Sequence, residues 1–320
     1  MLRLAFGLWL LSSLPVSAAG EMRTAEQVRA DFTYGRALVT GAVEGVTEYL
    51  PVSSTGHMII SDRLLDVPDD PHVTVAGVTD RKGRPVTLER IADDYLVIIQ
   101  LGAILAVCVA FFGRIRHLLV GLCRGERQAL SLGSAILVAF LPAALLGFLF
   151  KDAIGTYLFS VEVVAAALVV GGLVILIAEH LLPKKAAESA DEVAAIGWRS
   201  ALTVGLCQCF ALIPGTSRSL ATILGGRLAG LSHAAATEFS FLVGLLTLSA
   251  ASVYKMWSLG PALTQVYPAG PASVGLLVAA VTAFVCVKWL VGYVSRRGLG
   301  VFAWYRLALG GTILAFLALK

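Results

Sequence analysis

Six segments of the chain are each long and apolar enough to cross a lipid bilayer as a helix, which takes about 20 predominantly apolar residues. These segments are residues 94–112, 131–150, 161–182, 236–254, 271–293 and 301–319. The composition agrees, because 58% of the 320 residues are hydrophobic and only 14% are charged. A soluble domain carries about a quarter charged residues. We therefore predict an all-α polytopic membrane protein with six transmembrane helices.

Two further apolar segments, residues 34–60 and 198–228, are interrupted by short polar motifs. Each contains a proline, Pro51 or Pro214, which lacks a backbone donor and disrupts a helix. A broken segment is tolerated in a membrane only where protein or a water-filled cavity covers the freed backbone. We interpret both segments as re-entrant helical hairpins, with a kinked spanning helix as the alternative.

Basic residues are concentrated in alternate loops between the predicted spans. They are Arg114, Arg116, Arg124 and Arg127 after the first span, Lys184, Lys185 and Arg199 after the third, and Arg296 and Arg297 after the fifth. The positive-inside rule places these loops in the cytoplasm and both ends of the mature chain outside it. The net charge of +4 is too small to indicate a nucleic-acid partner.

The N-terminal residues 1–20 resemble a secretory signal, with Arg3 before an apolar stretch and small residues ending at Ala18. An uncleaved first helix is the alternative. Residues 21–319 are predicted to form a single membrane domain. Its long polar segment, residues 61–93, is predicted to be an external loop with turns or a small hairpin. A solvated connection is the default interpretation of this loop, and a lid is the alternative.

The two halves of this domain, residues 34–182 and 198–319, share short sequence matches. Gly41-Ala-Val-Glu44 matches Gly205-Leu-Cys-Gln208, and Pro51-Val-Ser53-Ser54 matches Pro214-Gly-Thr216-Ser217. Three predicted spans follow each interrupted segment. Because three is odd, the second interrupted segment must enter from the opposite face. The result is an inverted-topology repeat whose polar sites meet near the midplane.

The first motif carries two glutamates, Glu44 and Glu48, which are four residues apart and therefore share one face of a helix. Two close carboxylates repel unless a cation or a shared proton offsets their charge. A divalent cation such as Mg²⁺ or Ca²⁺ would do so, with substrate phosphates completing its oxygen ligands. The alternative is that one glutamate is protonated or paired with Arg218.

Hydroxyl and imidazole groups follow in the same motif. Ser53, Ser54 and Thr55 come after the helix-breaking proline, and Ser54 meets His57 if the chain re-enters a helix there. Such a pair offers a serine nucleophile beside a base, or an imidazole that attacks phosphorus itself. Helix capping is the alternative, and it is compatible with catalysis because a helix N-terminus also binds anions. We expect Ser53 and Thr55 to contact the substrate.

The second motif supplies Arg218, whose planar donor fork matches the geometry of a phosphate group. Small and polar neighbours are predicted to contact the same substrate, with Gln208 as the counterpart of Glu44; they are Gly215, Ser217, Ser219, Thr222 and Gln208. An arginine that pairs with a glutamate to close the two hairpins is the structural alternative. We predict that Arg218 lies close to Glu48 and Ser54.

These motifs closely resemble those of the undecaprenyl-diphosphate phosphatase family of bacterial membrane enzymes, which is linked to bacitracin resistance. The family pattern Glu/Gln-x-x-x-Glu followed by Pro-Val-Ser-Ser-Thr-Gly-His is complete from Glu44 to His57. The pattern Pro-Gly-x-Ser-Arg-Ser-x-x-Thr is complete from Pro214 to Thr222. The signal-like N-terminus and the long polar loop are unusual for the family, and Leu245 stands where a proline is common.

The resemblance implies removal of the terminal phosphate from a polyprenyl diphosphate lipid, undecaprenyl diphosphate, with the help of a divalent cation. It implies a site that opens to the periplasmic face of a bacterial inner membrane. Glu44 and Glu48 would serve metal and acid–base roles, Ser54 would be the nucleophile with His57 as base or rival nucleophile, and Arg218 would hold the diphosphate. A transporter or flippase of the lipid carrier is the alternative, because broken helices in inverted repeats also build transporters. The oligomeric state stays open, a homodimer included.

Overall fold

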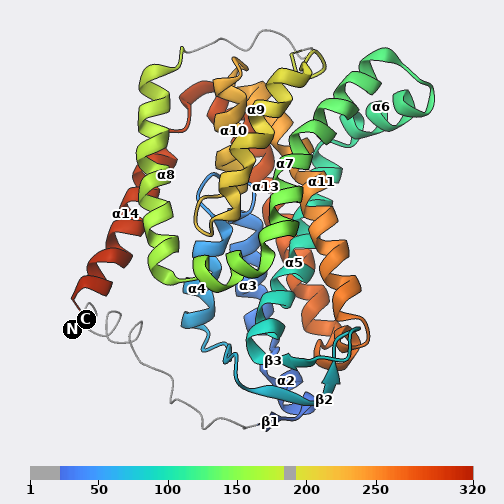
Figure 1. Cartoon of the computed structure of the whole chain (residues 1–320), viewed down its shortest axis with the longest axis vertical. Coiled ribbons are helices and arrows are strands. Elements are labelled where there is room, and N and C mark those ends of the chain that lie inside the picture. Colours follow the sequence, from blue (N-terminus) through green and yellow to red (C-terminus); the bar gives the residue numbers. More distant parts are fainter. Residues whose placement is uncertain (1–21, 184–191, 320) are drawn as a thin grey trace.

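The computed structural model describes residues 22–183 and 192–319. The predicted signal segment, together with Lys184 and Lys185 of the predicted cytoplasmic loops, lies outside the described residues. Six described helices are long and apolar enough to span a membrane. They are α5 (Leu88–Ala110), α7 (Arg127–Leu158), α8 (Val161–Leu181), α11 (His233–Leu259), α13 (Ala269–Arg297) and α14 (Gly300–Ala318). Each overlaps one predicted span, which confirms the predicted all-α polytopic membrane protein (Figure 1).

Shorter elements connect these helices. The helical ones are α2 (Ala25–Asp31), α3 (Tyr34–Thr47), α4 (Ser54–Leu64), α6 (Phe112–Cys123), α9 (Trp198–Gln208), the 3₁₀ helix η1 (Cys209–Leu212), α10 (Arg218–Leu228) and α12 (Ala262–Val266). The strands are β1 (Met22–Arg23), β2 (Thr74–Thr79) and β3 (Pro85–Thr87). Many large apolar side chains of the long helices face outward, among them Phe148 and Val281. Such a surface is rare on a soluble monomer and fits contact with hydrocarbon.

The polar segment 61–93 contains the small hairpin that its composition predicts, because β2 and β3 pair antiparallel. The sheet has a third strand that the sequence analysis did not predict. This strand, β1, lies far from the hairpin in the sequence and pairs parallel with β2. Apolar side chains of the hairpin, such as Val75 and Val86, pack with Val28 and Tyr95 in a small core of their own. The loop is therefore a folded cap on the ends of the neighbouring helices.

A buried carboxylate fixes the turn between β2 and β3. Asp80 forms ion pairs of 2.8 Å with both Arg84 and Arg90, and its Oδ1 accepts from the backbone N–H groups of Lys82 and Arg84. Burial alone raises the pKa of Asp80, but these donors outweigh it and hold that pKa below its ordinary value. A depressed pKa in the folded state means that Asp80 stabilises the fold above the pKa it has when unfolded, about 3.9.

We predict that acidification below about pH 4 weakens the hairpin, because the unfolded segment then binds a proton that Asp80 resists while its two arginines keep it ionised. Hydrogen exchange of residues 74–87, followed by mass spectrometry in detergent, should speed up as the pH falls below about 4 once corrected for the intrinsic rate. In Asp80→Asn the same residues should exchange fast already at pH 7. Equal protection of this variant and the wild type at pH 7 would refute the assignment.

Two pairs of shorter helices, α3 with α4 and α9 with α10, pack among the long helices. In Figure 1 the α9–α10 pair occupies the upper half and the α3–α4 pair the lower half, and the loops that connect each pair lie near the middle. The first helix of each pair packs on a long helix of the other half of the chain, α3 on α13 and α9 on α7. The two halves are therefore interlocked around the connecting loops.

Matching glycines allow this close packing. A Cβ atom on Gly41 of α3 would lie 2.4 Å from the carbonyl oxygen of Gly275, and one on Gly205 of α9 would lie 2.8 Å from that of Ala139. Both distances are too short for a real side chain. Gly41 and Gly205 are the residues that the sequence match pairs, so the matched positions perform the same packing task.

We call residues 48–53, between α3 and α4, and residues 213–217, between η1 and α10, the two connecting loops. They share an unusual backbone conformation. Ser53 and Ser217 have φ angles of 74° and 75°, a region that non-glycine residues rarely occupy. Each caps the helix that follows, Ser53 by accepting from Gly56 N and Ser217 by accepting from Leu220 N. The backbone therefore pairs Ser53 with Ser217, which lie equally far after the matched glycines Gly41 and Gly205. This register differs by one residue from the match between the two prolines.

Candidate functional site

The two connecting loops meet through side-chain donors of the second motif. Ser219 Oγ donates to the carbonyl oxygen of Leu50 at 2.9 Å, and Ser217 Oγ lies 3.4 Å from the same oxygen. Leu50 belongs to the stretch where α3 has ended, so its carbonyl accepts from the nearby Val52 N–H at 2.8 Å instead of from a residue one helical turn further on. The hydroxyl groups predicted for substrate contact thus also satisfy a freed backbone acceptor.

Glu48 joins the chemistry of the two motifs. Its Oε2 accepts a hydrogen bond of 2.7 Å from Ser54 Oγ, and its Oε1 lies 3.3 Å from Arg218 Nη2. The side chains of Glu48 and Arg218 are only 6% and 9% exposed. We call Glu48, Ser54 and Arg218 the polar cluster. The predicted proximity of these three residues is confirmed, and so is the ion pair that the structural alternative required.

The guanidinium of Arg218 is oriented by α11. Nη1 donates to the carbonyl oxygen of Ser240 at 3.2 Å, and the group lies 5.2 Å from the ring centre of Tyr49. A Cβ on Gly244 would lie 2.1 Å from Nη1, so only glycine fits there without displacing the arginine. The buried Nε has no hydrogen-bond partner. Arg218 therefore retains donor capacity for an anion.

The second carboxylate, Glu44, lies one helical turn before Glu48 and is 3% exposed. It interacts electrostatically with Glu48, and no described residue forms a hydrogen bond or ion pair with its side chain. Among the described residues, no group of three or more His, Cys, Asp or Glu side chains is placed so that it could hold a metal ion by itself. Two adjacent carboxylates with free lone pairs fit a Mg²⁺ or Ca²⁺ ion whose remaining ligands come from substrate and water.

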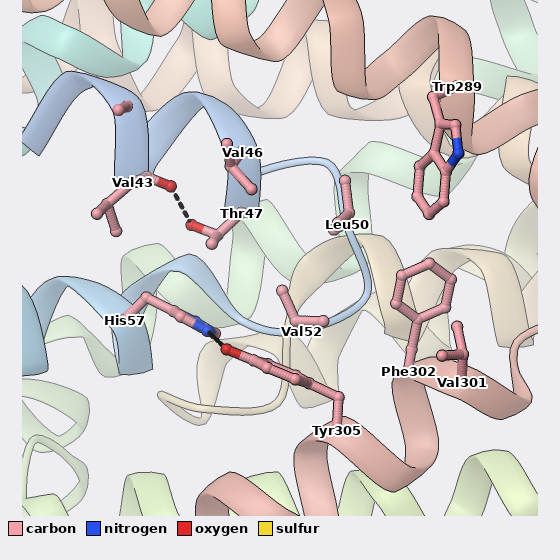
Figure 2. A pocket seen from close by; sticks show the side chains of 11 residues that line it. Val43, Val46, Thr47, Leu50, Val52, His57, Trp289, Val301, Phe302 and Tyr305 are labelled. Atoms are coloured by element: carbon pink, nitrogen blue, oxygen red, sulfur yellow. Dashed lines mark hydrogen bonds between the residues drawn. The ribbon is translucent and has the colours of Figure 1, made fainter. Parts of the chain in front are cut away.

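His57 points toward Tyr305 of α14 (Figure 2). Its Nδ1 lies 2.7 Å from the carbonyl oxygen of Ser53, so this nitrogen carries the proton. In the neutral ring Nε2 then accepts from the hydroxyl of Tyr305 at 2.5 Å, and the two rings are stacked 5.6 Å apart. Both ring nitrogens are occupied, whereas Ser54 donates to Glu48.

An apolar pocket of about 540 Å³ opens beside His57. Figure 2 shows side chains from α3, the first connecting loop, α13 and α14 around it. Its lining consists of Ala42, Val43, Val46, Thr47, Leu50, Val52, His57, Trp289, Val301, Phe302 and Tyr305. The Thr47 hydroxyl donates to Val43 O within its own helix, so the pocket offers an incoming molecule a mostly apolar surface.

Three further residues that were predicted to contact the substrate, Thr222, Gly215 and Thr55, lie in different surroundings. Thr222 Oγ1 lies 2.6 Å from Ser240 Oγ and so braces α10 against α11. Gly215 has a φ of 92°, and a Cβ there would lie 2.5 Å from the carbonyl oxygen of Val164. Thr55 lies, partly buried, in the first turn of α4. Thr222 and Gly215 therefore contribute to packing beside the polar cluster.

Gln208 is not brought to the polar cluster. Its Nε2 donates to Ala139 O of α7 at 3.1 Å, and its Oε1 lies 3.4 Å from Thr247 Oγ1 of α11. Although it matches Glu44 in sequence, Gln208 belongs to the opposite half, where its amide joins helices. We therefore do not assign it a contact with the substrate.

Two adjacent residues of α14, Tyr305 and Arg306, were missed by the sequence analysis. Tyr305 contacts His57, and Arg306 is fully buried and donates to carbonyl oxygens of both connecting loops. A signal existed, because an arginine inside an apolar span is expensive and therefore marks function.

The fold and the polar cluster define a helical membrane protein with a hydroxyl, carboxylates and a guanidinium gathered at its centre. A family model described as "Bacitracin resistance protein BacA" matches residues 37–312, and the chain belongs to this family. It is 45% identical over 280 residues to "Undecaprenyl-diphosphatase 2" of Rhodospirillum rubrum, which covers 88% of this chain and 93% of the relative. It is also 45% identical over 279 residues to "Undecaprenyl-diphosphatase 1" of Chromobacterium violaceum, with 87% and 94% covered.

We predict that Glu48→Gln lowers the unfolding free energy by about 3 kcal/mol, because it leaves the Arg218 charge buried without an anion. The double variant Glu48→Gln with Arg218→Met should recover part of this loss. Thermal unfolding in detergent measures both effects. The half-buried pair Arg114–Glu238, at 2.8 Å, is the control, and Glu238→Gln should cost about 1 kcal/mol or less. Equal costs for the two glutamine variants would contradict the prediction.

Proposed function

We propose that this chain hydrolyses undecaprenyl diphosphate to undecaprenyl phosphate and inorganic phosphate. The reaction recycles the lipid carrier of cell-wall synthesis and accounts for bacitracin resistance in the family. The names of the relatives support this substrate. The observation that carries the proposal is the Glu48 carboxylate, which accepts from a serine hydroxyl and pairs with a buried arginine.

The polar cluster supports a two-step displacement at the terminal phosphorus. In the first step a bond forms between Ser54 Oγ and phosphorus, the Ser54 proton passes to Glu48, and the bond to the bridging oxygen breaks to release undecaprenyl phosphate. In the second step water attacks the phosphoserine. Glu48 returns its proton to the departing Ser54 oxygen, accepts one from the water and releases it to solvent. Arg218 stabilises the negative charge on the phosphoryl oxygens throughout.

We assign the nucleophile to Ser54 rather than to His57. Ser54 has a base within hydrogen-bond distance, at 2.7 Å, which is the geometry that general-base activation requires. His57 would have to break its contact with Tyr305 or Ser53 before it attacked phosphorus. In this proposal His57 and Tyr305 lie beside the substrate and orient it.

The apolar pocket fits the polyprenyl chain. Its lining is largely aliphatic and aromatic, and His57 lies in that lining and follows Ser54 in the same helix. A lipid that lays its chain between α3, α13 and α14 would therefore bring its head group to the polar cluster. Binding of an apolar ligand in a concave apolar site with few polar groups is the usual arrangement.

A divalent cation fits beside the polar cluster. Glu44 and Glu48 would hold it, and when bound it would neutralise charge on the diphosphate. The protein alone supplies few ligands, which matches the way Mg²⁺ is usually bound, by one or two carboxylates together with substrate phosphates.

We further propose that α3–α4 and α9–α10 are re-entrant hairpins and that the site faces the periplasm of the bacterial inner membrane. The opposite directions of the two pairs and the basic loops after the first and third spans support this orientation. A flippase would need phosphate-binding groups but no activated serine, which favours the hydrolase.

Phosphate release from undecaprenyl diphosphate by the purified protein in detergent tests the reaction, because no membrane is left to transport across. Ser54→Ala should lower kcat by about 10³-fold or more, since nucleophile and base act as a unit. His57→Ala should cost about 10-fold or less. Ser61→Ala, a buried serine elsewhere on α4, is the matched control and should keep the wild-type rate. An inactive wild type would refute the hydrolase, and an active Ser54→Ala would refute the nucleophile.

Removal of divalent cations with EDTA should abolish phosphate release, and Mg²⁺ or Ca²⁺ should restore it. Glu44→Gln should raise the metal concentration for half-maximal rate by about 10-fold or more, because one of two carboxylate ligands is lost. Glu26→Gln, at an exposed position of α2, is the control and should leave the metal dependence unchanged. Full activity in EDTA would exclude the cation.

A further inference from the structure

A second arginine, Arg306 of α14, is buried between the two connecting loops. It is 0% exposed. Its Nη1 donates to the carbonyl oxygen of Pro51 at 3.3 Å, and its Nη2 donates to those of Gly215 at 2.9 Å and Ala167 at 3.0 Å. No described carboxylate forms an ion pair with it. A buried charge whose hydrogen-bond partners among the described residues are all carbonyl groups is costly, so the position of Arg306 requires a reason beyond packing.

The carbonyls that Arg306 contacts occupy equivalent positions in the two motifs. Pro51 lies three residues before Ser54, and Gly215 lies three residues before Arg218. Ser54 and Arg218 are in turn the first residues of α4 and α10, each directly after a serine with positive φ. One guanidinium therefore holds both loops at the point where each turns into the helix that carries a reactive group.

The neighbouring helix α8 is shaped for this contact. A Cβ on Gly171 would lie 2.2 Å from Arg306 Nη2 and 3.0 Å from its Nε, and the three nearest atoms to such a Cβ all belong to Arg306. Ala167, whose carbonyl is the third acceptor, precedes Gly171 by one turn of the same helix. The absence of a side chain at Gly171 is thus what admits the guanidinium.

We propose that Arg306 is a positioning residue, which holds the two connecting loops in register so that Ser54 and Glu48 face Arg218. The catalytic consequence rests on the proposed function, whereas the loop contact does not. Arg306 acts through the backbone, because its Nη groups are engaged by carbonyl oxygens. If Arg306 acted through its positive charge alone, a lysine at this position would serve equally well.

The test compares two variants that disturb this contact in different ways. Arg306→Lys keeps the charge but loses the planar fork that reaches several carbonyls at once. Gly171→Ala keeps the arginine but places a methyl group where the guanidinium lies. Both should lower kcat for phosphate release by about 100-fold, the effect of a displacement of about 1 Å in a catalytic group, with KM changed less than about threefold. In both, backbone amides of residues 49–57 and 213–219 should exchange faster with solvent than in the wild type.

Matched controls separate this role from general destabilisation. Arg227, a buried arginine of α10, also donates to carbonyl oxygens, those of Leu231 at 2.6 Å and Pro183 at 2.5 Å. A Cβ on Gly311 of α14 would meet nothing within 4 Å. Arg227→Lys and Gly311→Ala should therefore keep the wild-type kcat and the wild-type exchange of both connecting loops.

The outcomes distinguish the inference from the proposed function. Wild-type kcat in folded Arg306→Lys or Gly171→Ala would overturn the positioning role, as would unchanged exchange of the two loops. If Arg306→Lys does not fold, Gly171→Ala decides by the same measurements. A wild-type protein that releases no phosphate would defeat the proposed function, and hydrogen exchange would still accept or reject the contact between Arg306 and the loops.

Discussion

The structure depends on satisfying the backbone groups that two broken helices release inside an apolar protein. Where α3 and η1 end, carbonyl oxygens lose their helical donors, and in hydrocarbon each unpaired group costs several kcal/mol. Side chains supply the missing donors: Ser219 reaches Leu50 O, and Arg306 reaches Pro51 O and Gly215 O. These bonds close the interior and also bring the two polar motifs together. The same physical demand therefore builds the fold and the site.

The two halves of the chain have similar backbones but different chemistry. Ser53 and Ser217 share a positive φ and a capping role, so the residues that follow them, Ser54 and Arg218, occupy equivalent positions. One half places the proposed nucleophile there and the other a cation. Glu48 comes from the first half alone, while the position that matches Glu44 holds Gln208, which bonds to α7 and α11 instead. Because the chemistry is divided in this way, neither half holds a complete site.

The sequence was sufficient to predict features that follow from residue type and spacing. Bilayer-length apolar segments gave the six long helices, and two prolines among polar residues located the broken ones. The contact of Arg218 with Glu48 was predictable because a charge at membrane depth needs a partner. The direction of His57 was not, since it depends on Tyr305 in a distant helix. The contacts of Arg306 were not predictable, because no spacing pattern links it to the two distant loops that it joins. Strand β1 was missed because its partner strand is remote in the sequence.

Only 14% of the residues are charged. Two glycines make room for the two buried guanidinium groups, those of Arg218 and Arg306. Gly244 of α11 lies against the guanidinium of Arg218, and Gly171 of α8 lies against that of Arg306. Because these glycines carry no side chain, each guanidinium can approach a carbonyl oxygen of the same long helix. Arg218 donates to Ser240 O and Arg306 donates to Ala167 O in this manner. Each arginine is thus fixed by a neighbouring long helix before any substrate arrives. A cationic centre fixed in advance favours a phosphoryl transition state, because its donors need no reorganisation when negative charge develops.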